Sequence, residues 1–501
     1  MADRSRYNPF LILFDLISLM KNSFFFVLYL FVIKYGSDSA FIKYAKIALF
    51  LFIGITLVSI ILKWFTHKYK MDDTSFHIYK GLFKKSEKTI PFAKIQNVNR
   101  RTSLFHRIFK VTSIRFETGI KGMDNAVEFK VISRIEADRI EKLIMNPDTN
   151  TSIIIENDQE VEKSFAEATP IKLATARTVH FTPTKRDVLK ASFTSFSFLL
   201  LIPIIISLYI KIDGVFKIEE KADGLLTSFL NSWWLIGVVV AIIFIASITF
   251  GIIRAFFKYG KYEISSDDKQ IFILKGVIDE SAFTITKNRV QAIVITQSML
   301  KKLLGLAEVK LISTGNFGEE DSETNSLYPF LPVKRAYEII HEILPLYEVT
   351  QTMKPLPKKS FWVRLLKPSW LWIITTVALF YFKPAFFNTT QAWWILSVTL
   401  LLLIGASRIL DYFNSRYSIN DRFIQFKTGS LETSVFVSKR DKIIEVNISR
   451  GKLQQFLGLA SIGTVNHAKP VHHAGIDDIP VEIADNFYTW YAGRGSEIKI
   501  E

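Results

Sequence analysis

Residues 289–315 read RVQAIVITQSMLKKLLGLAEVKLISTG and combine two kinds of pattern. The runs at 292–296 and 308–313 are rich in β-branched and apolar residues, which is typical of strands. Between them, residues 298–304 have the pattern of one short helical turn, and Gly305 suits the left-handed residue that ends such a turn. We expect Leu303 and Leu304, just before this glycine, to face the interior of the domain.

This stretch occurs three times in the chain. Its opening motif lies at 289–293 in the second copy, at 94–98 in the first and at 442–446 in the third. The second copy continues as LLGLAEV and the third as FLGLASI, whereas the first has IFKVTSI at the same place. A Lys-x-Ser step also precedes each of three apolar helix pairs. The chain is therefore a threefold repeat, which decides the fold prediction.

Each copy contains several short strand-like runs and then one helical segment. The helical segments lie at 132–145, 333–344 and 483–491. Many short strands with one terminal helix fit a small barrel or sandwich that the helix covers.

Six apolar windows come in three pairs, one pair before each copy. A bilayer core of about 30 Å needs roughly 20 apolar helical residues. The windows are 22–33, 47–62, 191–210, 224–253, 368–382 and 384–407. The first is short, so two alternatives stay open: residues 10–33 form one long helix, or 10–20 is an interfacial helix before a short span. We predict six membrane-spanning helices.

Most of the net positive charge of the chain lies on one side of the predicted membrane helices. Paired helices place the N-terminus and all three soluble segments on one side. The short loops opposite hold seven basic and five acidic residues, so a net +14 of the formal +16 lies on the domain side. The positive-inside rule then makes that side cytoplasmic. We predict a multi-pass inner-membrane protein with cytoplasmic domains and termini, and no nucleic-acid partner.

The tract at 289–315, with its Arg-Val-Gln, Gln-Ser-Met-Leu, Leu-Leu-Gly-Leu-Ala and Ser-Thr-Gly steps, resembles a known domain. It is similar to the bacterial pleckstrin-homology-like (PH-like) domain of YdbS/YdbT-type multi-pass membrane proteins. The resemblance covers essentially the whole chain, and it implies a PH-like fold, a membrane location and no catalytic residues. The first copy departs at Lys110-Val111-Thr112, and the third has Gly451 in place of serine, so equal roles for the three domains are not implied.

We therefore predict an α+β membrane protein with three repeats of a transmembrane helix pair followed by a PH-like β-barrel or sandwich domain with a C-terminal helix. The predicted segments are 1–64 (helix pair 1), 65–165 (domain 1), 166–257 (linker and helix pair 2), 258–347 (domain 2), 348–414 (linker and helix pair 3), 415–495 (domain 3) and 496–501 (tail).

Few residues suggest chemistry. The chain has no cysteine, which excludes disulfides, thiolate metal sites and a cysteine nucleophile. P-loop, dinucleotide-binding and nucleophile-elbow patterns are absent. His467, His472 and His473 form the densest histidine group, which is either a metal or pH-sensitive contact or a solvated loop. We predict neither an enzyme activity nor a cofactor.

Basic residues are the candidate contact sites. One group surrounds a predicted hairpin of the first copy, where each cation near an anionic leaflet is worth about 1 kcal/mol of attraction. The alternative is a solvated hairpin, because the second copy has Asp279 and Glu280 at the matching place. A further cation is the first residue of each repeated motif. It either contacts a lipid or protein partner or is only a charged residue at the edge of a strand. The hairpin group is Lys80, Lys84, Lys85 and Lys88, and the motif cations are Lys94, Arg289 and Lys442.

The sequence favours a non-enzymatic membrane protein that presents three PH-like domains for binding or scaffolding. Expected partners are the lipid bilayer, anionic lipid headgroups and other membrane or cytoplasmic proteins, including a homologous membrane protein. The alternative is a six-helix transporter or channel with PH-like regulatory domains.

The charge asymmetry predicts the result of reporter fusions. Fusions at Glu167 and Asp321 should report the cytoplasm, and fusions at Gly214 and Asn388 should report the opposite face. Topology-sensitive phosphatase and fluorescent-protein reporters measure this directly. A cytoplasmic signal at Gly214 would contradict the arrangement of helices in pairs.

Overall fold

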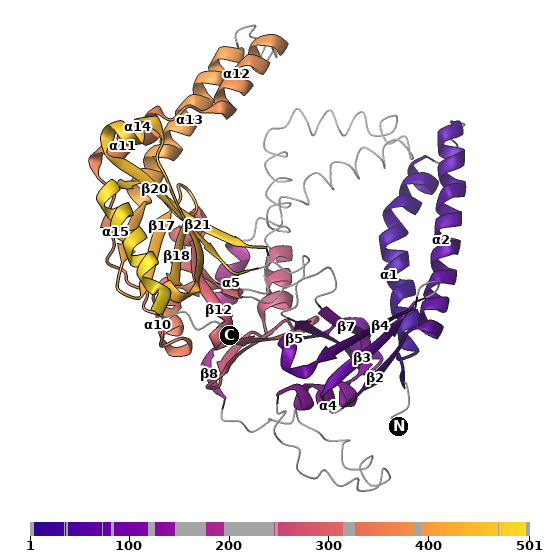
Figure 1. The fold of residues 1–501 in the computed structure, drawn as a ribbon. Coiled ribbons are helices and arrows are strands. Elements are labelled where there is room, and N and C mark those ends of the chain that lie inside the picture. Colours follow the sequence, from indigo (N-terminus) through magenta and orange to yellow (C-terminus); the bar gives the residue numbers. More distant parts are fainter. Residues whose placement is uncertain are drawn as a thin grey trace. The chain divides into compact units, whose positions relative to one another are not determined.

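Figure 1 shows the chain in a computed structural model. The structure describes residues 5–34, 36, 39–72, 74–81, 85–118, 126–145, 177–194, 245, 249–313, 326–383, 392–468 and 470–496. These residues belong to two compact units. The first comprises Met1–Thr178 with Gln270–Thr286, and the second comprises Val179–Lys269 with Lys287–Glu501.

The described residues include four helices long and apolar enough to span a membrane, at Phe10–Val32, Ala40–Thr66, Lys358–Phe382 and Trp393–Asn414. Helix α1 (Phe10–Val27) continues without a break into the π-helical turn η1 (Leu28–Ile33), so of the two alternatives for residues 10–33 the structure has the first, one long helix. The windows at 191–210 and 224–253 lie largely outside the described residues, as do the four fusion positions.

Two helix pairs rise from their own domains in Figure 1. Helices α1 and α2 (Ala40–Thr66) adjoin the first domain. Helix α11 (Lys358–Leu366), which leads into α12 (Trp370–Phe382), and helix α13 (Ala392–Asn414) adjoin the third. The long apolar faces of α2 and α12 are exposed, as expected of surfaces that contact lipid.

The first domain folds around an aromatic core. The rings of Phe76 and Phe116 stack with centroids 5.3 Å apart, and Phe129 packs against both. Ile140, from the terminal helix, is fully buried in the same core. The elements are β1 (Ser5–Arg6), β2 (Lys68–Met71), β3 (Ser75–Lys80), β4 (Ser86–Pro91), β5 (Ile95–Thr102), α3 (Leu104–Ile108), β6 (Val111–Thr118), β7 (Ala126–Ser133) and α4 (Arg134–Met145).

Strands of the second repeat complete the sheet of the first. Strands β10 (Gln270–Lys275) and β11 (Glu280–Thr286) form a hairpin, and β11 pairs antiparallel with β5 from Glu280↔Thr102 to Phe283↔Asn99. The described strands therefore form open sheets that run from one repeat into the next. The closed-barrel form of the prediction was wrong, because β5 pairs with a neighbouring repeat.

The second unit repeats this arrangement. Strand β12 (Val290–Gln297) of the second domain pairs with β18 (Thr433–Lys439) of the third, from Ala292↔Ser438 to Gln297↔Thr433. The sheet order is β14-β13-β12-β18-β17-β16-β15, and β19-β20-β21 form a separate sheet. Its strands and helices are β8 (Thr178–Phe181), α5 (Lys185–Thr194), β9 (Glu263–Ser266), α9 (Met299–Leu303), β13 (Leu306–Ser313), β14 (Ser326–Pro332), α10 (Val333–Ile343), β15 (Lys354–Pro355), β16 (Arg416–Ile419), β17 (Phe423–Thr428), β19 (Ile443–Ser449), α14 (Lys452–Leu457), β20 (Leu459–Asn466), β21 (His472–Pro480) and α15 (Val481–Ala492).

A common core and a polar cluster hold the second and third domains together. Val294 of the second domain and Phe436 of the third lie in one buried cluster. Asn466 is fully buried and donates from Nδ2 to the Ser438 hydroxyl at 2.7 Å. That hydroxyl donates in turn to the Gln291 carbonyl at 3.0 Å. A buried side chain thus links three strands from two repeats.

The short helix α9 corrects one expectation. Leu303 is 82% exposed, whereas Leu300 and Leu304 are half-buried. Residues four apart share a helix face, so Leu300 and Leu304 face the sheet while Met299 and Leu303 face outward. The prediction that Leu303 faces the interior was wrong, because one short turn has only one inward face.

The shared sheet predicts a specific disulfide. Thr296 and Ser434 are directly opposite across β12 and β18, where Cα atoms lie about 4.5–5.5 Å apart, within disulfide range. The cysteine-free chain carrying Thr296→Cys and Ser434→Cys should lose both free thiols on mild oxidation, as measured by thiol titration. Thr296→Cys with Lys439→Cys, five residues further along β18, is the control and should keep both. Equal behaviour of the two pairs would contradict the shared sheet.

Candidate functional site at the helix-pair junctions

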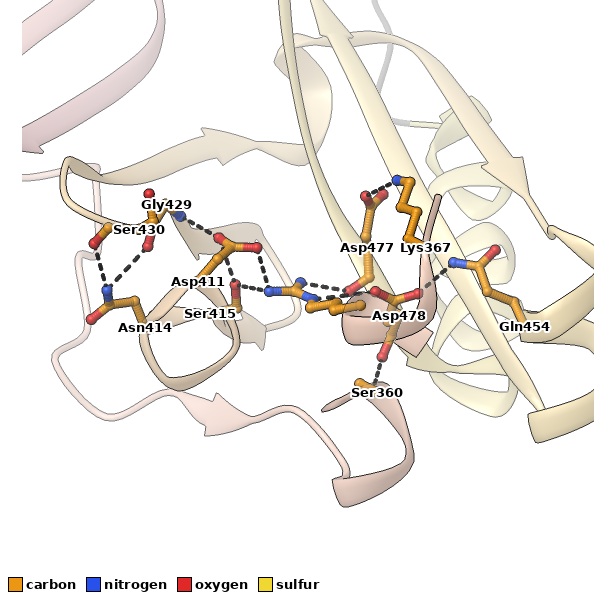
Figure 2. Close-up of polar contacts among 11 residues, drawn as sticks. Ser360, Lys367, Asp411, Asn414, Ser415, Gly429, Ser430, Gln454, Asp477 and Asp478 are labelled. Carbon is orange, nitrogen blue, oxygen red and sulfur yellow. Dashed lines mark hydrogen bonds and ion pairs between the residues drawn. The ribbon is translucent and has the colours of Figure 1, made fainter. Parts of the chain in front are cut away.

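One buried arginine joins the third helix pair to its domain. Arg364 lies on α11, and its side chain is 8% exposed. Its Nη1 donates to Asp411 Oδ2 at 2.6 Å and to Ser415 Oγ at 2.8 Å, at the end of α13. Its Nε donates to Asp478 Oδ2 and its Nη2 to the Asp477 carbonyl, both at 3.2 Å. Figure 2 shows these contacts, with Asp411 and Ser415 on one side of the network and Asp477 and Asp478 on the other.

Asp478 is the buried end of this network. It is 4% exposed, and its Oδ1 accepts a hydrogen bond from Gln454 Nε2 of α14 at 2.7 Å. Its carbonyl accepts one from the Ser360 hydroxyl of α11. Its φ of +63° is left-handed, a conformation that Asp and Asn tolerate better than other side chains. Two helices, α11 and α14, therefore converge on one aspartate of β21 that has an uncommon backbone conformation.

The last turn of α13 also holds the β17–β18 hairpin. Asp411 Oδ1 accepts from the Gly429 backbone N–H at 2.9 Å. Asn414 Nδ2 donates to the carbonyls of Gly429 and Ser430 at 3.1 and 2.9 Å. Gly429 has φ +113°, and a Cβ there would lie 2.0 Å from the Glu432 carbonyl oxygen, so the turn requires glycine. These hydrogen bonds fix the hairpin to the C-terminal end of the membrane helix α13.

Polar side chains also join the two helices of the third pair. Trp372 Nε1 donates to the Ser397 carbonyl at 3.1 Å, and the hydroxyls of Thr376 and Ser397 are 2.7 Å apart. Small hydroxyl residues at such positions let membrane helices approach closely and bond to each other. Arg408 of α13 donates to the Leu365 carbonyl of α11 at 3.1 Å.

Aromatic contacts dominate the junction of the first pair. Trp64 Nε1, in the last turn of α2, donates to the Tyr7 carbonyl at 3.0 Å. The Tyr7 and Tyr69 rings meet edge to face at 5.4 Å, and burial raises the pKa of Tyr7 to about 12. Lys130 of β7 pairs with Asp15 at 3.2 Å. Asp15 therefore lies at the domain end of α1.

A cavity of about 540 Å³ lies between α1 and α2 beside this ion pair. Its charged lining residues are Asp15, Lys63 and Lys130. Hydroxyl and amide side chains line the remainder together with apolar residues. The polar lining is Ser18, Asn22, Ser23 and Thr56.

Comparison with known proteins supports the repeat architecture. Residues 23–147, 200–346 and 372–495 each match the family described as Bacterial PH domain. The chain belongs to the bacterial PH domain family. The UPF0699 transmembrane protein YdbT of Bacillus subtilis (strain 168) is 25% identical over 508 residues, covering 98% of this chain and 99% of that protein. No solved structure matched the chain. The predicted membrane protein with three PH repeats is confirmed.

Of the hairpin cations of PH domain 1, Lys80 lies close to His67 at the end of α2. Burial, and then the nearby Lys80 and Lys63, lower the pKa of His67, the residue that follows α2. Lys85 is exposed and Lys88 is half-buried in β4, while Lys84 lies outside the described residues. At the matching hairpin of the second repeat, Glu280 pairs with Arg107 at 2.9 Å. The two hairpins thus differ in charge, and lipid contact by the first stays a prediction.

The motif cations occupy equivalent positions in the three repeats. Each ends a short 3₁₀ turn before a strand: η2 (Phe92–Lys94), η4 (Lys287–Arg289) and η5 (Arg440–Lys442). Lys94 is exposed, Arg289 and Lys442 are half-buried, and Lys442 lies 4.0 Å from Asp441. These turns lie at the opposite end of the adjoining strands from the short helices α3, α9 and α14.

The histidine group does not converge. His472 and His473 lie on β21, and the His472 ring stacks on Phe436 with centroids 5.6 Å apart. Burial lowers the pKa of His472. Within the described ranges, no group of three or more His, Asp and Glu side chains has metal-binding geometry.

The sequence analysis did not single out Arg364. Asp411, in the last turn of the mostly apolar helix α13, was the available signal, because a carboxylate next to lipid usually has a cationic partner. Asp478 had no local signal, since its partner lies 114 residues away in the sequence.

Two adjacent aspartates allow a matched stability test. Asp478→Ala leaves Arg364 partly unpaired and buried, so we expect a loss of about 3–5 kcal/mol of unfolding free energy. Asp477→Ala keeps the carbonyl and removes only an exposed contact to Lys367, so we expect a loss within about 1 kcal/mol. Denaturant-induced unfolding of the purified full chain, followed by tryptophan fluorescence, measures both. Equal losses would contradict the central position of Asp478 in the network.

Proposed function

We propose that this protein is a non-enzymatic membrane scaffold. In this proposal its three PH domains lie in the cytoplasm, held next to the inner membrane, and bind surfaces of other proteins and anionic lipid headgroups. The charge asymmetry of the loops supports the orientation, because 14 of the 16 net positive charges lie on the domain side.

The observation that carries the proposal is the fixed attachment of the third domain to its helix pair. Arg364 of α11 donates four hydrogen bonds, two to residues at the end of α13 and two to residues of β21. The β12–β18 pairing then continues this attachment into the second domain. A scaffold needs binding surfaces in a fixed position relative to the membrane, and these contacts supply that geometry.

The basic hairpin of the first domain supports a lipid contact. Lys80 ends β3 and lies close to His67, which follows α2, and Lys85 directly precedes β4. Cations next to a membrane helix attract anionic headgroups, and the attraction decays over about 8–10 Å at physiological salt.

The cavity between α1 and α2 favours one second candidate, a transporter. Its lining combines the Asp15–Lys130 pair with hydroxyl and amide groups along the helices, and polar groups inside a membrane often mark a transport path. The pair lies at the domain end of α1, which is why we prefer the scaffold.

Site-specific photocrosslinking in native membranes tests the scaffold. A photoreactive residue at Lys94, Arg289 or Lys442 should give a discrete protein adduct from at least one position, identified by mass spectrometry. The same residue at Lys85 should give phospholipid adducts that decrease at high salt. Lys85 and Lys94 are both exposed and lie at opposite ends of β4, so each is the control for the other.

Two results would contradict the scaffold. One is the absence of protein adducts from all three motif positions. The other is a substrate-dependent flux in proteoliposomes that Asp15→Asn abolishes, which would establish the transporter.

A further inference from the structure

The three repeats carry an exposed apolar side chain at the same position of the short helix that follows the motif strand. Ile108 of α3 is 73% exposed, Leu303 of α9 is 82% exposed and Phe456 of α14 is 88% exposed. Each lies five residues after the residue that caps its helix, at 103, 298 and 451. Single exposed apolar residues are common, but one that recurs at an equivalent position in three copies has a shared cause.

The capping of these helices sets the direction of the side chain. Ser298 Oγ accepts from the Lys301 backbone N–H at 3.4 Å at the start of α9. The helices end at left-handed residues: Lys110 (φ +53°), Gly305 (φ +66°) and Gly458 (φ +69°). A turn closed at both ends holds its outward residue in place, so the apolar side chains are presented to the outside and do not fold back onto the sheet.

In the second unit, Leu303 lies at the membrane end of the sheet. Gln297, two residues before α9, pairs with Thr433 at the β17–β18 hairpin. The same hairpin bonds through Gly429 to Asp411, in the last turn of α13. The root of the helix pair and the short helix of the second domain are therefore at one end of the shared sheet.

Phe456 lies at the same end of this unit. Its helix α14 packs beside α11, and Gln454 of α14 shares Asp478 with Arg364 of α11. Helix α11 itself exposes Trp362 and Leu366, which are four residues apart and so share a face. Figure 1 shows α11 and α14 next to the root of α13. Phe456, the exposed apolar tip of α14, thus continues the exposed apolar face of α11, which leads into the membrane helix α12.

In the first unit the short helix α3 also lies next to the end of a membrane helix, through aromatic contacts. The ring of Phe105 on α3 lies 5.5 Å from that of Phe14, and Phe109 lies 4.7 Å from Phe10, in the first turns of α1. These two rings attach α3 to the root of the helix, while Ile108 on the same turn faces outward.

A cation accompanies each apolar tip. Lys110, Lys302 and Lys452 flank or belong to the three helices. Burial, and then Lys427, lower the pKa of Lys302. Apolar side chains next to cations are typical of segments that lie in the interface of a bilayer, with the charge at the headgroups and the apolar group below it.

We propose that Ile108, Leu303 and Phe456 insert into the interfacial region of the leaflet on the domain side. Each PH domain then contacts the membrane through its short helix, in addition to the covalent connection through its helix pair. The proposal deepens the scaffold by naming the lipid bilayer as the partner of this surface. Its test does not involve protein partners, so the two proposals fail on different results.

Spin labelling of the cysteine-free chain tests the insertion directly. Single Leu303→Cys, Phe456→Cys and Ile108→Cys variants carry a nitroxide, and the full chain is reconstituted in vesicles of phosphatidylethanolamine and phosphatidylglycerol. Collision rates with oxygen, which concentrates in lipid, and with a neutral nickel chelate, which stays in water, are measured by electron paramagnetic resonance. Insertion predicts oxygen collision rates several-fold above those with nickel at all three positions.

Leu346 provides a matched control in the same unit. It is a leucine of 71% exposure next to Tyr347, whose hydroxyl donates to the Val290 carbonyl at 2.8 Å. Val290 starts β12 and α9 follows its other end, so the Tyr347 contact and α9 are separated by the length of an eight-residue strand, about 25 Å. A nitroxide at Leu346 should collide mainly with nickel.

Two outcomes would overturn the insertion. Dominant nickel collisions at Leu303 and Phe456 would show that the tips are in water. Low collision rates with both reagents, together with spin–spin broadening, would show that the tips contact a second copy of the chain.

Discussion

The pairing of strand edges between neighbouring repeats determines most of this structure. Strand β12 has free backbone donors and acceptors on one side unless another strand lies there, and an unpaired edge invites pairing with any available strand. The third repeat supplies β18 along six consecutive register positions, from Ala292↔Ser438 to Gln297↔Thr433. Strand β11 satisfies β5 in the same way. Each such hydrogen bond adds about 0.5–1.5 kcal/mol net, and the paired sheets also bury Val294 and Phe436 in a common core.

The helix pairs depend on this sheet for their orientation. Arg364 binds the ends of α11 and α13 to β21, and Gly429 binds the β17–β18 hairpin to α13. Because β18 is also the partner of β12, the position of the membrane helices is passed to the second domain through continuous backbone pairing. The first pair reaches a similar result with aromatic packing around Tyr7 and with the Lys130–Asp15 pair. Buried charge and aromatic packing are thus two solutions to one task, the fixing of a domain against a membrane.

The sequence predicted features that repeat locally and missed features that depend on distant partners. The threefold motif, the apolar helices and the terminal helices α4, α10 and α15 follow from periodicity within short windows. The pairing of β12 with β18 has no such signal, because its register depends on two strands more than a hundred residues apart. The Arg364 network was missed for the same reason, since its acidic partners lie 47 and 114 residues away. Leu303 was assigned to the interior together with Leu304, because both precede Gly305, although a single turn has one inward face.

The most direct test of the shared sheet is hydrogen exchange of β18 amides in the full chain within lipid nanodiscs, resolved to single residues. In an antiparallel strand, consecutive backbone N–H groups point alternately to the two neighbours. If β12 and β17 flank β18, the consecutive amides of Val435, Phe436, Val437 and Ser438 should all exchange slowly. If β18 is an edge strand paired only with β17, every second amide should exchange rapidly, and the shared sheet would be contradicted.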